Sequence, residues 1–380
     1  MNTKNFFLAP LIASLLFCSI HNNSYASEDN NKAAKNEISS YIISESYSNI
    51  LPVKLLLKDD WKQAPAEDAS IGFTQNEIGV KAYWQNFTFG IAHRLDYFVY
   101  TNSDTAEAFY LERTDQPLTT QDSYKLSLKL HHQRSNGFRF GYKWQYESFS
   151  TEVNIGYWDV TATRESHING EVFGEENNNI TGTAQLSEFY SDKNFLKRDK
   201  FDRWDIDGYG VTVDVSALWQ INNKLNLALH IKDLYSKYRM KNLGYSEGNV
   251  DTEGTFINSL GGQSYLPLYR GKETSDNYQF ELPEHINLIA HYQEDSFSSE
   301  TLDINYVARY KRQGTVNFYY AGVQLDFDTA TLSLMLDLEN LSPQMQYNNQ
   351  WFNIIFAIDE LDIEKAKQFT LGMAVNYSFN

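Results

Sequence analysis

The sequence predicts an all-β protein, an antiparallel transmembrane β-barrel of about 12 to 14 strands with long extracellular loops. Apolar and polar residues alternate with period two along most of the chain, as in strands with two unlike faces. The alternating segments are about ten residues long, which suits a tilted membrane strand. Aromatic residues recur at segment ends, as in interfacial girdles: Trp84, Tyr97, Tyr124, Tyr146, Trp219, Tyr310, Trp351 and Tyr377. The alternative is a soluble β-sandwich. Its strands also alternate apolar and polar residues, but it explains neither the length of the segments nor the aromatic residues at their ends.

Composition and charge narrow the class further. The chain has 380 residues, of which 15% are aromatic, whereas disordered chains are poor in aromatic residues. Its formal net charge is -17, so nucleic acid is not expected as a partner. An acidic protein can still lie in a membrane if its acidic residues are concentrated in loops.

The N-terminus has the three parts of a secretory signal peptide. Lys4 supplies the positive charge, residues 6–20 form an apolar run, and Ser24-Tyr25-Ala26 is a small-x-small cleavage site. We therefore expect residues 1–26 to be removed on export. Cys18, the one cysteine of the chain, leaves with them, so the mature protein is not a disulfide scaffold.

The first regular strands form two predicted hairpins. Residues 78–84 and 87–97 alternate on either side of a short turn at Gln85-Asn86. Residues 124–130 and 138–146 alternate in the same way around Ser135-Asn136-Gly137. Because Asn-Gly is a strong hairpin signal, we expect a turn there.

The alternation continues to the end of the chain. The middle contributes segments 153–157, 209–215 and 225–231, and the last third adds 286–290, 302–306, 316–320, 332–338 and 352–356. The final segment is the most regular, with an apolar face made by Phe369, Leu371, Met373, Val375, Tyr377 and Phe379.

These segments divide the chain into three parts. After the signal peptide, residues 27–75 are expected to form a plug or linker, and the barrel is expected to occupy residues 76–380. Two long polar stretches, Arg164 to Asp207 and Met240 to Pro283, are predicted to be extracellular loops.

The C-terminal segment resembles the assembly signal of bacterial outer-membrane β-barrel proteins. Those signals combine a polar residue, a glycine and spaced hydrophobic residues, and they end on an aromatic residue. Thr370, Gly372, Val375, Tyr377 and Phe379 match this pattern, and Asn380 follows the usual terminal aromatic. The resemblance implies a place in the outer membrane of a Gram-negative cell, contact with its lipid, and insertion by the barrel-assembly machinery.

A finer resemblance rests on three segments in the second half of the chain. Asp207-Gly208-Tyr209-Gly210-Val211, the strand 225–231 and Glu281-Leu282-Pro283 look like parts of the long-chain fatty-acid transporter superfamily and its TraF-like relatives. The Asn-Pro-Ala motif that the fatty-acid transporters carry near the mature N-terminus is not found here. The resemblance therefore implies no fatty-acid substrate.

Charged residues on the predicted inward faces are the candidate site. A basic stripe on the early strands would oppose acidic residues on later strands across the lumen: Arg94, Lys125, Lys129, Arg139 and Lys143 against Asp214, Asp303 and Asp337. In an open pore such rows create a transverse field that selects solutes. Alternatively, the rows pair with each other and fill a closed lumen.

The sequence favours a pore or conduit for small solutes. One alternative is a plugged barrel for hydrophobic ligands, which predicts an N-terminal plug and a lateral gap between strands. Another is a structural barrel that uses its loops for surface interactions. A hydrolase is the weakest reading, because no histidine lies in a convincing nucleophile constellation.

No cofactor or metal is expected. The carboxylates of Asp199, Asp202, Asp205 and Asp207 are clustered, but they lack the glycine and closing glutamate of a calcium loop. Zinc is not expected either, since the mature chain has no cysteine and its histidines are scattered.

Overall fold

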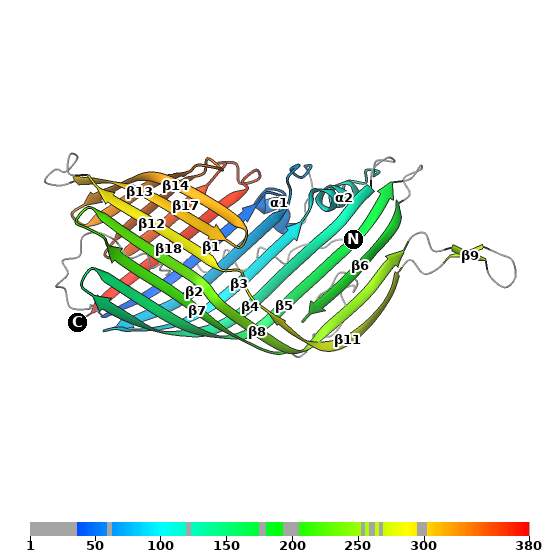
Figure 1. Cartoon of the computed structure of the whole chain (residues 1–380), viewed down its shortest axis with the longest axis horizontal. Helices are drawn as coiled ribbons and strands as arrows, with labels where there is room; N and C mark the ends of the chain where they lie inside the picture. The colour runs from blue at the N-terminus through cyan, green and yellow to red at the C-terminus, as the bar shows by residue number, and fades with distance from the viewer. Residues whose placement is uncertain are drawn as a thin grey trace.

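A computed structural model shows a closed antiparallel β-barrel (Figure 1). It describes residues 36–58, 63–118, 123–174, 180–192, 204, 206–251, 255–257, 263–265, 269–294 and 302–379. The sheet closes on itself because β1 (Asn36–Ser48) pairs with β2 (Ile71–Trp84) on one side and with β18 (Gln368–Phe379) on the other. The expected signal peptide lies outside the described residues.

Within the described residues, sixteen strands fill fourteen positions around the barrel. Two positions each hold two strands in succession: β6 (Ile180–Tyr190) is followed by β7 (Asp207–Gln220), and β11 (Tyr269–Phe280) by β12 (His285–Gln293). The remaining positions are filled by β3 (Phe87–Thr101), β4 (Ser123–Tyr146), β5 (Phe149–Gly174), β8 (Leu225–Asp251), β13 (Leu302–Gln313), β14 (Val316–Phe327), β15 (Ala330–Asp337), β16 (Pro343–Asn349) and β17 (Phe352–Ile358).

The barrel has a termini end and a loop end. Asn36 pairs with Phe379, so the first and last strands meet at the termini end. Most turns at that end are short, such as Gln85-Asn86 between β2 and β3. The loop end carries the longer connections, including α1 (Val53–Lys58) and α2 (Ser103–Arg113). Neither helix is long and apolar enough to cross a membrane.

The wall is much taller on one side than on the other. β4, β5 and β8 have 24, 26 and 27 residues, whereas β15, β16 and β17 have 8, 7 and 7. The long strands continue beyond the short wall at the loop end (Figure 1). There β6 pairs with the end of β5, and β11 pairs with the end of β8. A small separate hairpin of β9 (Thr255–Ile257) and β10 (Gln263–Tyr265) lies at the far end of this extension.

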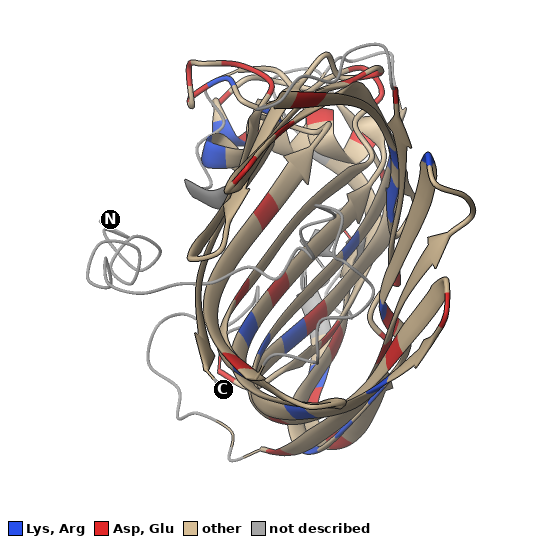
Figure 2. Ribbon diagram, turned by 90° about the vertical axis from the view of Figure 1, so that its left-hand side faces the viewer, with Lys and Arg blue, Asp and Glu red and all other residues tan. Residues whose placement is uncertain are grey.

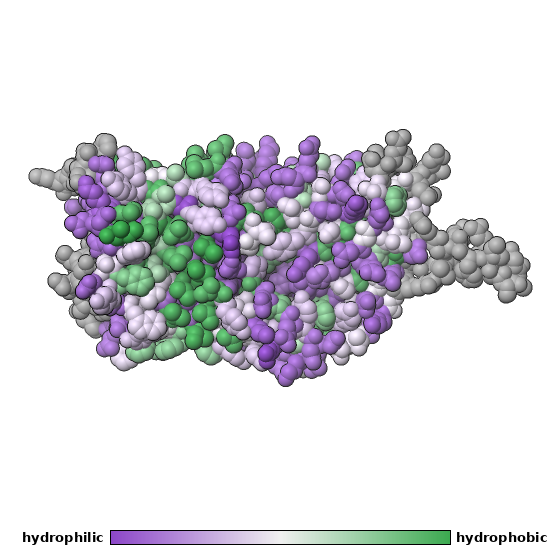
Figure 3. Space-filling view, viewed as in Figure 1, coloured by the Kyte–Doolittle hydropathy of each residue, from purple (hydrophilic) through white to green (hydrophobic). Residues whose placement is uncertain are grey.

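The two faces of the wall differ as membrane barrels require. On β3, Phe89 and Ile91 point outward and are exposed, while Arg94 and Asp96 point inward and are buried. Figure 3 shows apolar residues gathered on the half of the molecule that holds the C-terminus, and hydrophilic residues on the half with the extension. Neighbouring strands of a closed sheet satisfy each other's backbone groups, so this apolar face can contact lipid. The chain is an antiparallel transmembrane β-barrel.

Three expectations about strand boundaries differ from the structure. The barrel does not begin near residue 76: β1 starts at Asn36 and belongs to the wall. Its sequence, with adjacent polar residues such as Ser39-Ser40, lacks the clean alternation of the later strands. Both predicted long loops also contain ladder residues, namely the end of β5 with β6 in the first and the end of β8 with β11 in the second.

The third difference concerns Asn136-Gly137. No turn forms there, and β4 runs unbroken from Ser123 to Tyr146. A Cβ at Gly137 would collide with the indole ring of Trp158 on β5, so the glycine makes room for this ring. The glycine therefore serves packing inside the barrel, where sequence reasoning predicted a hairpin.

Candidate functional site

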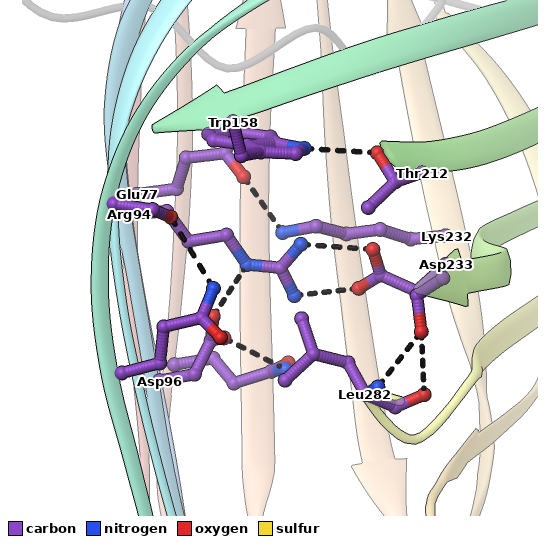
Figure 4. Close-up of polar contacts among 12 residues, drawn as sticks. Glu77, Arg94, Asp96, Trp158, Thr212, Lys232, Asp233 and Leu282 are labelled. Atoms are coloured by element: carbon purple, nitrogen blue, oxygen red, sulfur yellow. Dashed lines mark hydrogen bonds and ion pairs between the residues drawn. The ribbon is translucent and has the colours of Figure 1, made fainter. Parts of the chain in front are cut away.

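Charged side chains cross the lumen near its middle. Arg94 on β3 is 1% exposed, and its guanidinium nitrogens lie 2.9 and 2.5 Å from the two carboxylate oxygens of Asp233 on β8 (Figure 4). Its Nε lies 2.7 Å from Asp96 Oδ2. This bidentate geometry is the strong form of an ion pair. Here it crosses the lumen between two strands that lie four positions apart in the barrel wall.

A second pair lies beside the first. Arg139 on β4 donates to both carboxylate oxygens of Glu77 on β2, and Lys232 on β8 reaches the same carboxylate at 2.8 Å. The Tyr41 hydroxyl donates to Glu77, and Asp214 lies 3.4 Å from Arg139 Nε. We call the set of these charged residues the ionic layer: Glu77, Arg94, Asp96, Arg139, Asp214, Lys232 and Asp233.

The indole ring of Trp158 on β5 packs against both arginines of the ionic layer. Arg139 lies 4.8 Å and Arg94 5.8 Å from the ring centroid. The indole NH donates to the Thr212 hydroxyl at 3.0 Å, and the side chain is fully buried. A buried guanidinium gains from such an aromatic face, so Trp158 holds the layer in place as well as filling space.

A distortion in β8 presents Asp233 to the lumen. Asp233 has φ of 56°, the left-handed region that non-glycine residues seldom adopt. The ladder with β7 is irregular at this point, and the Asp233 amide donates to the side chain of Asp214 at 2.8 Å. The bulge thus interrupts the alternation of β8 and turns a carboxylate inward.

Further contacts cross the lumen toward the short wall. Lys311 on β13 lies 3.1 Å from Glu45 on β1, and the Gln313 amide on β13 donates to Gln75 on β2. Gln75 in turn donates to Asp96 at 3.2 Å, which connects this crossing to the ionic layer. Figure 2 shows acidic and basic residues lying near one another on the strands seen inside the barrel. Together these side chains close the lumen.

A cavity of about 430 Å³ lies on the loop-end side of the ionic layer. Phe98, which lines it, follows Asp96 on the same face of β3, so the cavity borders the layer. Its lining combines four Phe and Tyr rings with six charged, histidine or amide side chains and one proline: Phe98, Tyr100, Lys129, His131, Glu165, Lys237, Tyr278, Gln279, Phe280, Glu281 and Pro283.

One carboxylate organises the polar side of this cavity. Glu165 on β5 is buried and lies 2.6 Å from His131 Nδ1 and 3.2 Å from His167 Nε2. Lys129 Nζ is more distant, at 3.5 Å, and the Lys129 side chain is 51% exposed. The glutamate is therefore engaged by its neighbours, while the lysine stays accessible.

The barrel wall is interrupted beside the cavity. β11 ends at Phe280 and β12 starts at His285, so residues 281–284 and the facing residues 233–237 of β8 have no ladder pairing with each other. We call this place the wall break. The Ser236 hydroxyl accepts from the Leu282 amide at 2.7 Å and lies 3.2 Å from the Leu282 carbonyl oxygen, so one side chain replaces two ladder bonds (Figure 4).

Aromatic rings lead from the extension into the cavity. Tyr245 and Phe189 lie 4.7 Å apart, Phe189 and Tyr278 stack at 4.3 Å, and Tyr278 is followed by Phe280 on the same strand. Phe280 then stacks on Tyr238 at 4.8 Å. We call these five residues the aromatic series.

The structure brings together only part of the predicted charge rows. Arg94, Arg139 and Asp214 join the ionic layer, and Lys129 lines the cavity. The others lie elsewhere. Lys125 is exposed in the extension, and Lys143 lies near the termini-end turn between β2 and β3. Asp303 lies near the termini end of β13, and Asp337 accepts hydrogen bonds from Glu339 and Asn340 in its own turn.

Sequence reasoning missed four members of the layer. Asp96 shares a face with Arg94 and could have been found from the alternation alone. Glu77 precedes the segment that we read as the first strand, and Lys232 and Asp233 lie where the pattern of β8 breaks off.

The residues of the C-terminal signal lie on β18. Thr370 is buried on the lumen face, while Tyr377 and Phe379 are exposed on the outer face near the termini end. Gly372 pairs with Ile43 of β1 and Ile355 of β17, so the signal includes the strand that closes the barrel. Its recognition by the assembly machinery stays a prediction.

No group of three potential metal ligands occurs among the described residues. Of the carboxylate cluster considered in the sequence, Asp199, Asp202 and Asp205 lie outside the described part of the chain.

Comparisons with known proteins find likeness only in structure. Neither protein-family models nor curated protein sequences gave a match. Similar solved structures include a TodX monoaromatic hydrocarbon channel mutant (9% identity, TM-score 0.43, 92% of this chain and 91% of that chain). They also include the Ralstonia pickettii toluene transporter TbuX (7%, 0.41, 92% and 90%) and a Pseudomonas aeruginosa FadL homologue (6%, 0.31, 91% and 91%). At these values the likeness says nothing about the substrate of this chain.

Proposed function

We propose that this barrel is an outer-membrane conduit for small amphipathic solutes, with the cavity as its binding site and the ionic layer as its gate. The observation that carries the proposal is the cavity itself, which lies inside the barrel at the loop end and borders the layer. An acidic or basic pore would need free charges along the lumen, whereas here Arg94 and Arg139 are both held in ion pairs. The barrel binds and passes its solute without covalent chemistry.

The lining favours an amphipathic solute over a purely apolar one. Four aromatic side chains, Phe98, Tyr100, Tyr278 and Phe280, supply apolar surface. Charged and amide groups supply the rest, and small-molecule sites combine these two kinds of lining in this way. The interrupted pairing at the wall break lies beside the cavity, where a barrel for hydrophobic ligands would have its lateral gap, and this supports keeping part of that alternative in the proposal.

Solute flux into proteoliposomes tests this proposal. We expect a fluorescent amphipathic dye to enter liposomes that contain the barrel faster than empty ones. Gln279→Trp places a bulky ring in the cavity lining and should reduce the flux several-fold, since the cavity holds only a small solute. Asn277→Trp is the matched control, because Asn277 is exposed on the same strand and does not line the cavity.

Equal flux with and without the barrel would contradict the conduit. A flux that Gln279→Trp leaves unchanged would contradict the role of the cavity.

A further inference from the structure

The cavity holds accessible positive charge beside stacked aromatic rings. The Glu165 side chain is 3% exposed, and its oxygens face His131, His167 and, at 3.5 Å, Lys129, so little of its carboxylate surface is left for a ligand. Lys129 is half exposed, and Lys237 has no ion-pair partner among the described residues. The one accessible acid among the lining residues is Glu281 at the wall break, so two lysines face one glutamate and the net accessible charge is positive.

The two lysines approach the cavity from different strands. Lys129 projects from β4, and Lys237 from β8 at the wall break. Tyr100, Tyr278 and Phe280 line the same cavity. An ammonium group binds a carboxylate through a charge-assisted hydrogen bond, and a planar ring gains from stacking on aromatic side chains.

We infer that the cavity binds ring-bearing carboxylates, with the carboxylate held by Lys129 and Lys237 and the ring on the aromatic series. This inference rests on the proposed function, because it names the solute class of the same cavity. The aromatic series supports it independently of charge. Its rings follow one another from Tyr245 in the extension to Phe280 at the cavity, so a planar solute meets aromatic surface along the way in.

Calorimetric titration of the barrel in nanodiscs, with empty nanodiscs as reference, tests the inference with three probes. These are 2-naphthoate, its neutral amide 2-naphthamide, and decanoate, which has the charge without the ring. We expect 2-naphthoate to bind about tenfold more tightly than 2-naphthamide, which is the scale of one charge-assisted hydrogen bond. Decanoate should bind several-fold more weakly than 2-naphthoate, because it cannot stack.

Substitutions that remove a positive or a negative charge from the cavity make the test more specific. Lys129→Gln and Lys237→Gln should each weaken 2-naphthoate binding about tenfold and leave 2-naphthamide unchanged. Glu281→Gln removes the accessible acid and should strengthen 2-naphthoate binding. Lys125→Gln is the control, because Lys125 lies on the same strand as Lys129, is exposed, and does not line the cavity. Each variant is first checked for the heat-modifiable mobility of a folded barrel.

The outcomes distinguish failure of this inference from failure of the proposed function on which it rests. If 2-naphthoate and 2-naphthamide bind alike, or if the lysine variants bind 2-naphthoate normally, the anion inference is wrong while the cavity remains a solute site. If decanoate binds as tightly as 2-naphthoate, the ring preference is wrong. If no probe binds above the level of empty nanodiscs, the inference and the proposed function both fail.

Discussion

Trp158 links the packing of the barrel to its ionic layer. Its ring lies against the guanidinium groups of Arg94 and Arg139 and occupies the space beside Gly137. A side chain at position 137 would push the ring away from its place. The glycine is therefore required by the indole, and through the indole by the two arginines.

Gly137→Ala tests this dependence at the level of one methyl group. We expect the free energy of unfolding to fall by about 1–3 kcal/mol, as for overpacked cores. Gly90→Ala is the matched control: it is also a strand glycine on the lumen face, but its nearest foreign atoms would lie at an ordinary 3.4 Å. Urea unfolding of both variants in lipid vesicles measures the difference in their free energies of unfolding. Equal values would show that the Trp158 ring moves aside without a cost in stability.

The residues of the site were predictable only where the strand pattern is regular. Arg94 and Arg139 lie in segments with regular alternation, so the pattern alone predicts that both side chains face the lumen. Asp233 was not predictable, because its inward position depends on a bulge with positive φ. Alternation gives the face of a side chain, but it does not give the partner across the lumen.

At the scale of elements, β1 decides whether the barrel closes. It pairs over twelve residues with β18 and over twelve with β2. Without it, two strand edges would face lipid with unpaired backbone groups, which is costly in the absence of water. The segment before residue 76 is thus part of the wall, although its sequence favoured a plug or linker.

Deleting residues 36–48 should therefore abolish folding. We expect the shortened protein to lose the heat-modifiable band of a folded barrel on gel electrophoresis after refolding into detergent. Deleting residues 27–34 is the control, because the described ladder starts at Asn36. A folded barrel without residues 36–48 would mean that β1 is dispensable.

Most strands were predictable because the membrane imposes a polar face and an apolar face on each. The extension was not predictable, because polar residues occupy successive positions in β6 and β11, so the contrast between two faces is lost. The stretches 164–207 and 240–283 therefore resembled loops, although β6 and β11 pair with the long strands there.

For the whole molecule, the unequal wall sets the position of the cavity. The tall strands β4, β5 and β8 rise beyond the short wall, and β11 covers the cavity from the side of the wall break. The ionic layer lies just below and connects β2, β3 and β4 with β8. In the proposed function, a solute therefore enters at the loop end and is stopped at the layer.

Whether the lumen was open or closed could not be read from the sequence. The same residues can line a pore or fill it, and the choice depends on distances across the barrel. In the structure Arg94 and Asp233 form a bidentate ion pair, and Lys311 and Gln313 reach β1 and β2, so these groups pair with each other across the lumen.

Single-channel conductance tests the central claim that the ionic layer closes the barrel. The measurement compares the wild-type protein with the double variant Glu77→Ala plus Asp233→Ala in a planar bilayer. Both substitutions remove acids that hold basic residues of β3, β4 and β8 in the layer. We predict brief, small openings for the wild type and sustained openings with anion preference for the variant, since the released basic residues then face the lumen. A folded variant that conducts no more than the wild type, or a wild type that already conducts steadily, would contradict the account.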